Sequence, residues 1–272
     1  MNRNILLLII SFLFCSYING QSHKELVNSA LAAKDMTKAE EQLKAWSLAD
    51  SIDPELYISY SNFYTIKSQE AGLLSTTGYD VNYSKKALEY IAYGIERYPT
   101  RFDMYIVKIY LLAKLKDYKS FTSEIIKMIE LSDKIKNNWR GIDFETLDNA
   151  EKILYGAILE FQGILLKEKL YDNMIQISET TLKYYPRHVQ SILDLSTVYF
   201  NLNKPDESIN LLTIATQIEP ENAIVQYNLA YLYSLKGDKT NAKKYYELVV
   251  VNAKEEEAVL KNSAQQHLEE LK

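Results

Sequence analysis

A repeated stretch near the C-terminal end of this 272-residue chain constrains the fold more than any other feature. Two consecutive segments align without a gap: VQSILDLSTVYFNLNKPDESINLLTIATQIEPEN and AIVQYNLAYLYSLKGDKTNAKKYYELVVVNAKEE. Each begins with a helix-period apolar pattern, breaks at a turn sequence and resumes with a second helix. Pro186 and Pro220 are 34 positions apart, which equals the length of each aligned segment. The repeat predicts helix pairs that stack in series, each covering the apolar face of its neighbour.

The second of these segments resembles the tetratricopeptide repeat family. Small residues let its two helices approach closely, aromatic residues fill the space beside them, and a glycine followed by aspartate ends one helix and caps the next. The positions that carry the resemblance are Leu229, Ala230, Tyr233, Gly237, Asp238, Ala242 and Tyr246, and in the preceding repeat Leu195, Ser196, Tyr199, Ser208, Leu212, Ala215 and Pro220. The resemblance implies an all-α, right-handed superhelical solenoid of helix-turn-helix repeats with a C-terminal capping helix, exported from a bacterial cell.

Earlier parts of the chain keep the phase of the repeat with weaker signal. The best-matching repeats cover 155–254, and 255–271 reads as a capping helix with its apolar residues on one stripe. Proline spacing implies two insertions, which we place around 132–146 and around 69–82. About six helix pairs and a final helix are expected within a repeat domain over 21–272. The early third is also compatible with a divergent helical bundle.

Composition supports helices joined by short connections. The chain has only 8 Gly and 5 Pro against 47% hydrophobic residues, so it lacks the turn formers that many short strands require. Its 31 basic and 36 acidic residues are interspersed and give a net charge of -5. Basic residues cluster on surfaces that bind nucleic acid, so neither DNA nor RNA is an expected partner.

The N-terminal 1–20 has the order of a secretory signal peptide. Arg3 precedes an apolar run from Ile5 to Phe14, and a short polar stretch follows. The run is too short to span a bilayer, which takes about 20 residues, so no membrane span is expected after signal removal. Cleavage after Gly20 predicts an exported protein, periplasmic or secreted. Lipidation at Cys15, the only cysteine, ranks second because Phe14 is not the small residue that lipoprotein signals carry there.

No residue pattern predicts catalysis, a cofactor or a metal. Three histidines, His23, His188 and His267, lie too far apart along a stacked array to converge. The usual metal, nucleotide and dinucleotide motifs do not occur. The acidic triplet 255–257 begins the predicted capping helix, where negative charge favours the helix dipole.

The resemblance implies a partner-binding groove lined by one face of the first helix of each pair. The groove is aromatic and aliphatic, although any one of its residues has an alternative role in packing between helices. The lining residues are not the Lys and Asn with which chaperone adaptors of this family clamp a terminal carboxylate, so such a clamp is not expected. The candidate partner-binding positions are Tyr110, Leu159, Leu193, Thr197, Phe200, Tyr227 and Tyr231.

Trp139, within the longer insertion, is a further candidate for partner contact. Long loops with their own aromatic residues are often functional or packed on the scaffold. Packing of Trp139 and Phe144 against neighbouring helices is the favoured interpretation, and contact with a partner is the alternative.

These observations predict a non-enzymatic scaffold that binds a protein or peptide in the cell envelope or the secreted space. Two alternatives remain: a lipid-anchored envelope assembly factor, which depends on Cys15, and a helical enzyme or sugar-binding protein. The second alternative requires acidic and aromatic residues to converge on one deep pocket. The partner's identity, the pathway and the oligomeric state do not follow from the residues.

Overall fold

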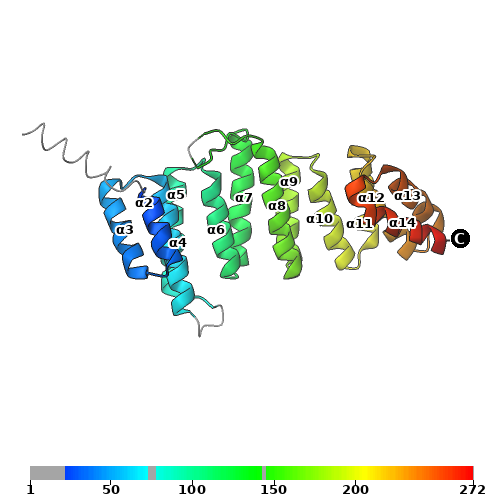
Figure 1. Ribbon diagram of the computed structural model, residues 1–272. Helices are drawn as coiled ribbons and strands as arrows, with labels where there is room; N and C mark the ends of the chain where they lie inside the picture. Colours follow the sequence, from blue (N-terminus) through cyan, green and yellow to red (C-terminus); the bar gives the residue numbers. More distant parts are fainter. Residues whose placement is uncertain (1–21, 73–77, 143–144, 272) are drawn as a thin grey trace, which may run out of the picture. The chain divides into compact units, whose positions relative to one another are not determined.

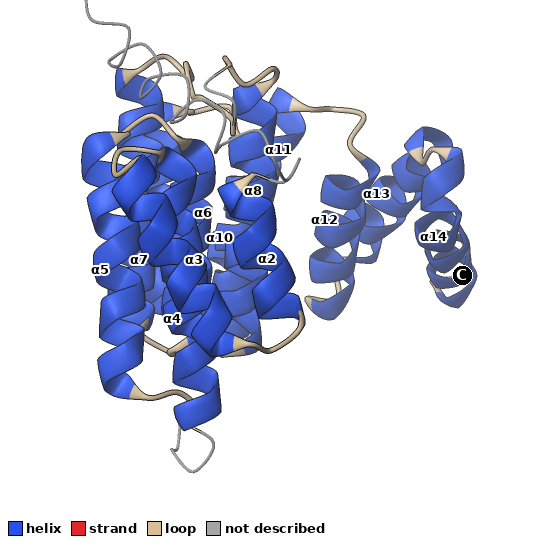
Figure 2. Ribbon diagram, turned by 60° about the vertical axis from the view of Figure 1, so that its left-hand side comes forward, coloured by secondary structure: helices blue, strands red, loops and turns tan. Residues whose placement is uncertain are grey.

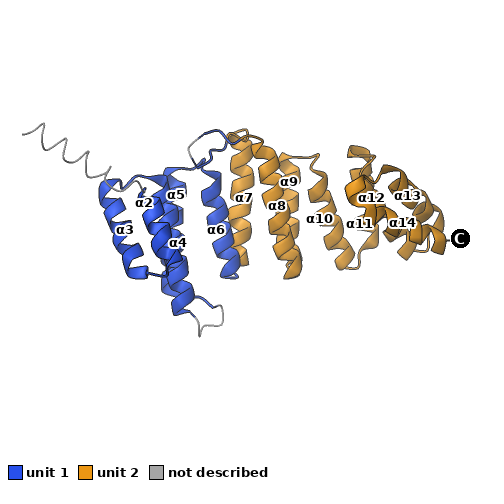
Figure 3. Cartoon of the chain, in the orientation of Figure 1, with its two compact units in different colours: residues 1–117, 139–147 blue, residues 118–138, 148–272 orange. Residues whose placement is uncertain are grey.

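The computed structural model describes residues 22–72, 78–142 and 145–271, and its regular elements over these ranges are helices (Figures 1 and 2). The predicted signal peptide and Cys15 lie outside the described residues. The chain divides into two compact units (Figure 3). Unit 1 comprises Met1–Asp117 and Trp139–Leu147, and unit 2 comprises Tyr118–Asn138 and Asp148–Lys272.

Unit 1 contains five helices in the part of the chain that the structure describes. They are α2 (His23–Ala32), α3 (Met36–Ala49), α4 (Pro54–Ala71), α5 (Val81–Arg97) and α6 (Phe102–Lys114). Helices α2, α3 and α4 share an apolar core that includes Val27, Leu43, Trp46 and Phe63. The side chain of Asp53 caps α4 by accepting the backbone N–H of Glu55, and Pro54 occupies the first helical position, where its missing N–H costs nothing.

Unit 2 holds the repeats recognised in the sequence. Its helices are α7 (Tyr118–Lys134), α8 (Ala150–Lys167), α9 (Tyr171–Tyr184), α10 (Val189–Asn201), α11 (Pro205–Ile218), α12 (Ala223–Leu235), α13 (Lys239–Asn252) and α14 (Ala258–Glu270), with a 3₁₀ turn at Glu255–Glu257. Leu193, Leu212 and Leu229 belong to one core cluster that joins α10, α11 and α12. Each pair therefore buries apolar surface against the next, as stacking in series requires.

One turn geometry recurs at the period of the repeat. Lys169, Asn203 and Gly237 all have a left-handed backbone, with φ of 58°, 59° and 76°. The next residue in each turn donates its N–H to a carbonyl five positions back, for example Asp238 to Tyr233 at 2.9 Å. This bond satisfies a carbonyl at the end of the first helix and reverses the chain. The same backbone closure thus joins the helices of three successive pairs.

The two helices of each late pair touch through small or hydrogen-bonded residues. Ala230 of α12 and Ala242 of α13 are fully buried. The equivalent contact of the preceding pair is a hydrogen bond between the Ser196 and Ser208 hydroxyls, 2.7 Å apart. One pair earlier, Gln162 replaces the small residue and donates to the Ser178 hydroxyl at 2.8 Å. A large polar side chain is accommodated there because it finds buried acceptors.

Helix α14 packs on the last pair with one face. Ala264 is fully buried in a cluster that contains Tyr246 and Val249 of α13. Leu260, Leu268 and Leu271 lie against the same cluster. Glu269 and Glu270 lie on the solvent side. The helix covers apolar surface that no further pair covers within unit 2.

A buried charge cluster organises the start of α6 in unit 1. Arg101 is fully buried. Its guanidinium donates to Asp103 at 2.6 and 2.8 Å and to Glu55 of α4 at 2.5 Å. Lys24 of α2 also donates to Glu55, at 2.7 Å. These ion pairs tie α2, α4 and α6 together, and desolvation makes each partner of the buried guanidinium necessary.

Trp139 belongs to this unit, where it packs against α6. Its side chain is fully buried and meets Phe102 and Tyr105 edge to face, with ring centroids 5.3 and 5.4 Å apart. The backbone N–H of Arg140 donates to the Thr100 carbonyl at 2.8 Å and holds the segment in place. The favoured interpretation of Trp139, packing against neighbouring helices, agrees with this burial, which leaves the indole little surface for the alternative, contact with a partner. Phe144 lies outside the described residues.

The predicted all-α class is confirmed, and the described residues contain six helix pairs followed by one further helix. The shorter insertion spans fewer residues than predicted, because α4 continues to Ala71 and α5 begins at Val81. The longer one is shifted toward the C-terminus, because α7 continues to Lys134 and α8 begins at Ala150. Among the helices that the structure describes, none is both long and apolar enough to cross a membrane.

Candidate functional site

Large apolar side chains remain exposed on the first helices of the pairs in unit 2. Leu159 of α8 is 49% exposed, Phe200 of α10 is 40%, and Ile224 and Tyr231 of α12 are 47% and 40%. Single exposed apolar residues are ordinary, but these side chains, placed on one 34-residue repeat, fall at successive three- and four-residue steps along one helix face and so form a surface. We call the surface made by Leu159, Leu193, Thr197, Phe200, Ile224 and Tyr231 the first-helix face.

One pocket of the first-helix face lies where α10, α11 and α12 meet. Its volume is about 180 Å³. Thr197, Phe200 and Tyr231 line it, and the Phe200 and Tyr231 rings meet edge to face at 6.1 Å. The hydrogen-bonded hydroxyls of Ser196 and Ser208 also line the pocket. Three residues predicted from the sequence are therefore brought together in one apolar, partly polar hollow.

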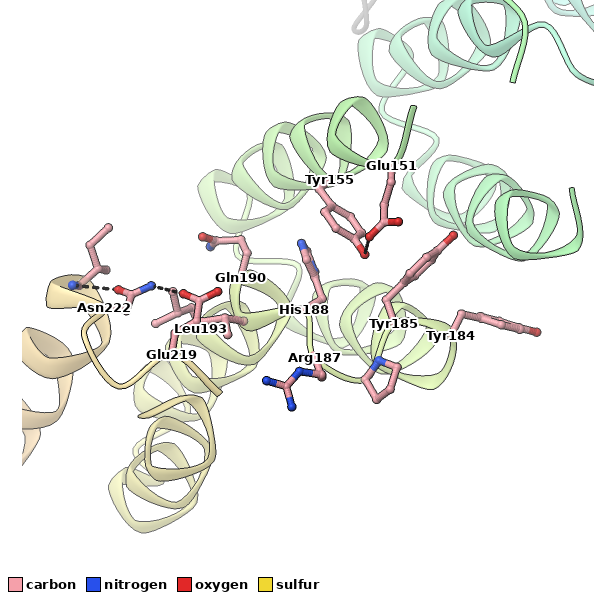
Figure 4. A pocket seen from close by; sticks show the side chains of 13 residues that line it. Glu151, Tyr155, Tyr184, Tyr185, Arg187, His188, Gln190, Leu193, Glu219 and Asn222 are labelled. Carbon is pink, nitrogen blue, oxygen red and sulfur yellow. Dashed lines mark hydrogen bonds between the residues drawn. The ribbon is translucent and has the colours of Figure 1, made fainter. Parts of the chain in front are cut away.

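A larger pocket of about 600 Å³ opens at the other end of α10 (Figure 4). Leu193 lines it, together with Gln190 of the same helix. Gln190, Leu193, Thr197 and Phe200 follow one another at three- and four-residue spacing, so one face of α10 contributes to both pockets. The other lining residues are Glu151, Tyr155, Tyr184, Tyr185, Pro186, Arg187, His188, Val189, Glu219, Asn222 and Ile224.

The larger pocket has an aromatic wall. Figure 4 shows Tyr155 and Glu151 reaching from α8 toward Tyr185 and His188 of the turn before α10. The Tyr155 ring lies 4.0 Å from the His188 ring and meets the Tyr185 ring edge to face at 5.4 Å. The Tyr155 hydroxyl donates to Glu151 at 2.6 Å. Burial and this carboxylate raise the pKa of Tyr155, so its hydroxyl keeps its proton.

A buried carboxyl group lies behind the lining of this pocket. Asp194 is 8% exposed, and its Oδ1 accepts a hydrogen bond from Gln190 Nε2 at 3.0 Å. Its Oδ2 is buried and has no hydrogen-bond partner. Burial raises the pKa of Asp194 to about 6, against the opposing effect of the Gln190 bond. Burial likewise lowers the pKa of His188, which keeps that ring neutral near pH 7.

Three groove residues predicted from the sequence line neither pocket. Tyr227 is half-buried and packs against Tyr246 of α13 and His267 of α14, with ring centroids 5.7 and 6.2 Å away. Its neighbours make it part of the core under α14. Tyr110 is half-buried in α6 of unit 1, and Leu159 is exposed on α8 without lining either pocket.

Sequence reasoning missed the aromatic and acidic residues of the larger pocket. Tyr155, His188 and Glu219 come from a helix, a turn and a helix end that no local pattern connects. A signal was available for Asp194, because a charged residue between Leu193 and Leu195 in an apolar helix marks a buried group. Among the described residues, no group of three or more His, Cys, Asp or Glu side chains is arranged to hold a metal ion.

Residues 223–250, which correspond to α12 and most of α13, match the family model described as a tetratricopeptide repeat. No curated protein matches the chain in sequence.

Solved tetratricopeptide repeat structures resemble the chain at low identity. YrrB, described as having an unusual peptide-binding site, is 14% identical with a TM-score of 0.44, covering 82% of this chain and 97% of that chain. A tetratricopeptide repeat protein from Parabacteroides merdae is 17% identical with a TM-score of 0.41, covering 93% and 90%. PilF of Pseudomonas aeruginosa is 14% identical with a TM-score of 0.41, covering 78% and 93%.

The family match identifies residues 223–250 as a tetratricopeptide repeat, and the turn geometry of this segment recurs in the preceding pairs of unit 2. The match itself covers α12 and α13, and the earlier pairs carry the same turn closure.

Proposed function

We propose that the chain is a non-catalytic scaffold that binds a segment of another protein on the first-helix face of unit 2. The observation that carries the proposal is that Leu159, Phe200, Ile224 and Tyr231 expose apolar side chains on one face of the first helices, and that this face of α10 also lines two pockets. Leaving such a surface in water is unfavourable, and a partner that covers it gains the free energy of burial.

The shape and chemistry of the two pockets suit an extended or helical peptide better than a small molecule. The smaller pocket accepts one apolar side chain, and the larger one is open and combines aromatic rings with polar groups. A surface with a few anchoring pockets, an apolar centre and a polar rim is typical of protein recognition.

We further propose that the protein acts in the cell envelope or outside the cell. The signal-like order of residues 1–20 motivates this placement, and Cys15 leaves lipid anchoring as the alternative. Mass spectrometry of the mature N-terminus separates the two. A chain that begins at Gln21 supports cleavage and export, a lipid-modified Cys15 supports the anchor, and an intact Met1 overturns both.

Site-specific photo-crosslinking in native cells tests the binding proposal. A photoreactive amino acid at Phe200 or Tyr231 should give discrete crosslinks to a protein partner. The same group at Ile214, which is 48% exposed on α11 outside the first-helix face, provides the matched control. Equal crosslinking at all three positions, or none at Phe200 and Tyr231, contradicts the proposal.

The larger pocket also gives the sugar-binding or enzymatic alternative one specific observation, because Glu151, Glu219, Tyr155 and Tyr185 converge there. The peptide-binding proposal is preferred because Tyr155 and His188 face each other at 4.0 Å, which occupies the ring faces that a sugar would stack on. Saturable binding of a monosaccharide or oligosaccharide, lost on Tyr155→Ala and kept on Phe200→Ala, would reverse this preference.

A further inference from the structure

The larger pocket is lined by two carboxylates, Glu151 and Glu219, that form no ion pair with another residue in the part of the chain that the structure describes. Glu151 accepts hydrogen bonds from the Tyr155 hydroxyl at 2.6 Å and from Asn137 Nδ2 at 3.3 Å. Glu219 accepts from Asn222 Nδ2 at 2.7 Å. All these donors are neutral, and within the described residues no ion pair of 4.0 Å or less involves Glu151 or Glu219.

Positive charge is scarce in the same lining. Arg187 is its one basic residue apart from His188, and the Arg187 side chain is exposed and extends away from Glu151 and Tyr155 (Figure 4). His188 contributes no charge near neutral pH, because burial lowers its pKa. The lining is therefore acidic overall.

Aromatic rings lie next to these carboxylates. Tyr155, Tyr184 and Tyr185 are all half-buried in the pocket. A guanidinium or ammonium group is attracted to the face of a tyrosine ring, and the attraction grows when the site is partly desolvated. Rings beside carboxylates therefore offer a cation both of the interactions that it favours.

Asp194 lies apart from the two lining carboxylates and is bonded to a residue of the pocket. Asp194 is more than nine-tenths buried, its Oδ2 is unpartnered, and its Oδ1 is bonded to Gln190, which lines the pocket. A buried carboxyl oxygen without a partner is unusual, and one explanation is a donor that arrives with a ligand. Gln190 lines the pocket and donates to Asp194, so this carboxyl group lies beside the lining.

We propose that the larger pocket receives a lysine or arginine side chain of the bound protein segment. The cation lies beside Glu151 and the Tyr185 ring, while Glu219 at the opposite side of the lining and Asp194, bonded to Gln190, add negative charge. This inference rests on the proposed function and adds the chemistry of the partner. An acidic segment is disfavoured by the same charges.

The spacing of the two pockets adds a sequence rule for the partner. Gln190 and Phe200 are ten residues apart on α10, which is about 15 Å along a helix. An extended segment covers that distance in about four to five residues. The partner should therefore carry a basic residue and a large apolar residue about four or five positions apart, with the apolar one in the pocket of Thr197, Phe200 and Tyr231.

Selection from a library of random displayed peptides, with the purified chain as bait, tests the proposal without a known partner. The expected consensus has a basic residue and a large apolar residue at this spacing. A selected peptide is then synthesised with arginine at the basic position and again with citrulline, the neutral isostere. Citrulline should raise the Kd of the wild-type chain at least about fivefold.

Variants of the pocket residues test whether the difference in Kd between the arginine and citrulline peptides arises at this pocket. The Glu151→Gln/Glu219→Gln double variant should bind the two peptides with nearly equal Kd, and Asp194→Asn should narrow the gap. Glu221→Gln, at an exposed carboxylate outside the pocket, should keep the full difference. Arg187→Gln should tighten binding of the arginine peptide, because it removes a like charge. Circular dichroism checks that every variant keeps its helical content.

The outcomes distinguish the two levels of the proposal. An apolar consensus without a basic residue, or equal Kd for arginine and citrulline in the wild-type chain, overturns the cation pocket and leaves the binding function standing. An acidic consensus also overturns the cation pocket. A library that yields no enriched sequence counts against both. Loss of the difference in Glu221→Gln as well as in the double variant removes the assignment to this pocket.

Discussion

Unit 1 and unit 2 bury polar groups in different ways. In unit 1 the fully buried Arg101 depends on the carboxylates of Asp103 and Glu55, which come from different helices. In unit 2 the contact within a pair is a hydroxyl pair, Ser196 and Ser208, or two alanines at the same places of the next repeat. A buried charge needs every partner, whereas a small neutral contact tolerates exchange. The packing of unit 1 around Arg101 thus depends on one charge cluster, whereas the helix pairs of unit 2 pack through equivalent small contacts that repeat from pair to pair.

The largest effect is expected from removing the buried charge of unit 1. Arg101→Leu leaves Glu55 and Asp103 without the guanidinium, and breaking a buried ion pair in this way costs about 3 to 5 kcal/mol of unfolding free energy. Chemical denaturation followed by circular dichroism measures the loss. Arg97→Leu, at an exposed position of α5, is the matched control and should change the midpoint little. Equal effects of the two variants would show that the ion-pair cluster does not organise unit 1.

Asp194 is the exception in unit 2, and its replacement should stabilise the protein. Its folded pKa of about 6 lies above the ordinary value of 3.8, so ionisation above pH 6 is opposed by the folded state. Asp194→Asn should raise the unfolding free energy by about 2 to 3 kcal/mol at pH 7.5, since one pKa unit corresponds to about 1.4 kcal/mol. The gain should shrink as the pH falls through 6 and vanish below about 4, where both states are protonated.

Thermal unfolding at several pH values follows this difference. A gain that is constant from pH 4 to pH 7.5 would mean that the variant acts through packing rather than charge. A loss at every pH would mean that Asp194 has a partner in the folded protein, which contradicts the buried and unpaired Oδ2.

The tight contacts of unit 2 predict sensitivity to added volume. Ala230 is fully buried against the second helix of its pair, so Ala230→Leu should lower the unfolding free energy by about 1 to 3 kcal/mol. Ala258→Leu, at an exposed position of α14, adds the same volume without a contact and serves as the control. An unchanged midpoint for Ala230→Leu would invalidate the register that places Ala230 between the helices.

The smallest change in unfolding free energy is expected when the contact of one helix pair in unit 2 is replaced by the contact of the next pair. The Ser196→Ala/Ser208→Ala double variant copies the alanine pair of the following repeat, and removing both partners of a neutral hydrogen bond is nearly neutral. The unfolding free energy should change by less than about 1 kcal/mol. A loss as large as that of Arg101→Leu would erase the contrast between the two units.

The repeats of unit 2 were predictable because their information is local. Gly237, Asp238, Ala230 and Ala242 have roles that depend only on the backbone and the partner helix of one pair, so aligned sequence exposes them. Thr197, Phe200 and Tyr231 were predicted for the same reason and do gather at one pocket. Whether they bind a partner stays a prediction.

Other features depend on contacts distant in sequence. The residues around Arg101 do not predict its hydrogen bond to Glu55. The residues around Trp139 likewise do not predict that Phe102 and Tyr105 cover its ring. Tyr227 occupies a groove position of the family, but α14 lies close enough for His267 to contact its ring. The aromatic wall of Tyr155 and His188 likewise forms only after two pairs have packed. Such residues require the assembled fold.

The membership of Trp139–Leu147 in unit 1 has a consequence for the order of synthesis. A ribosome that has completed α6 has not yet translated Trp139, and it must first produce all of α7. Until then the rings of Phe102 and Tyr105 lack the indole that covers them. The nascent chain therefore exposes an aggregation-prone aromatic surface while the ribosome translates about two dozen further residues, at about 5 to 20 residues per second. Any fragment that ends at Asp117 would expose that surface permanently.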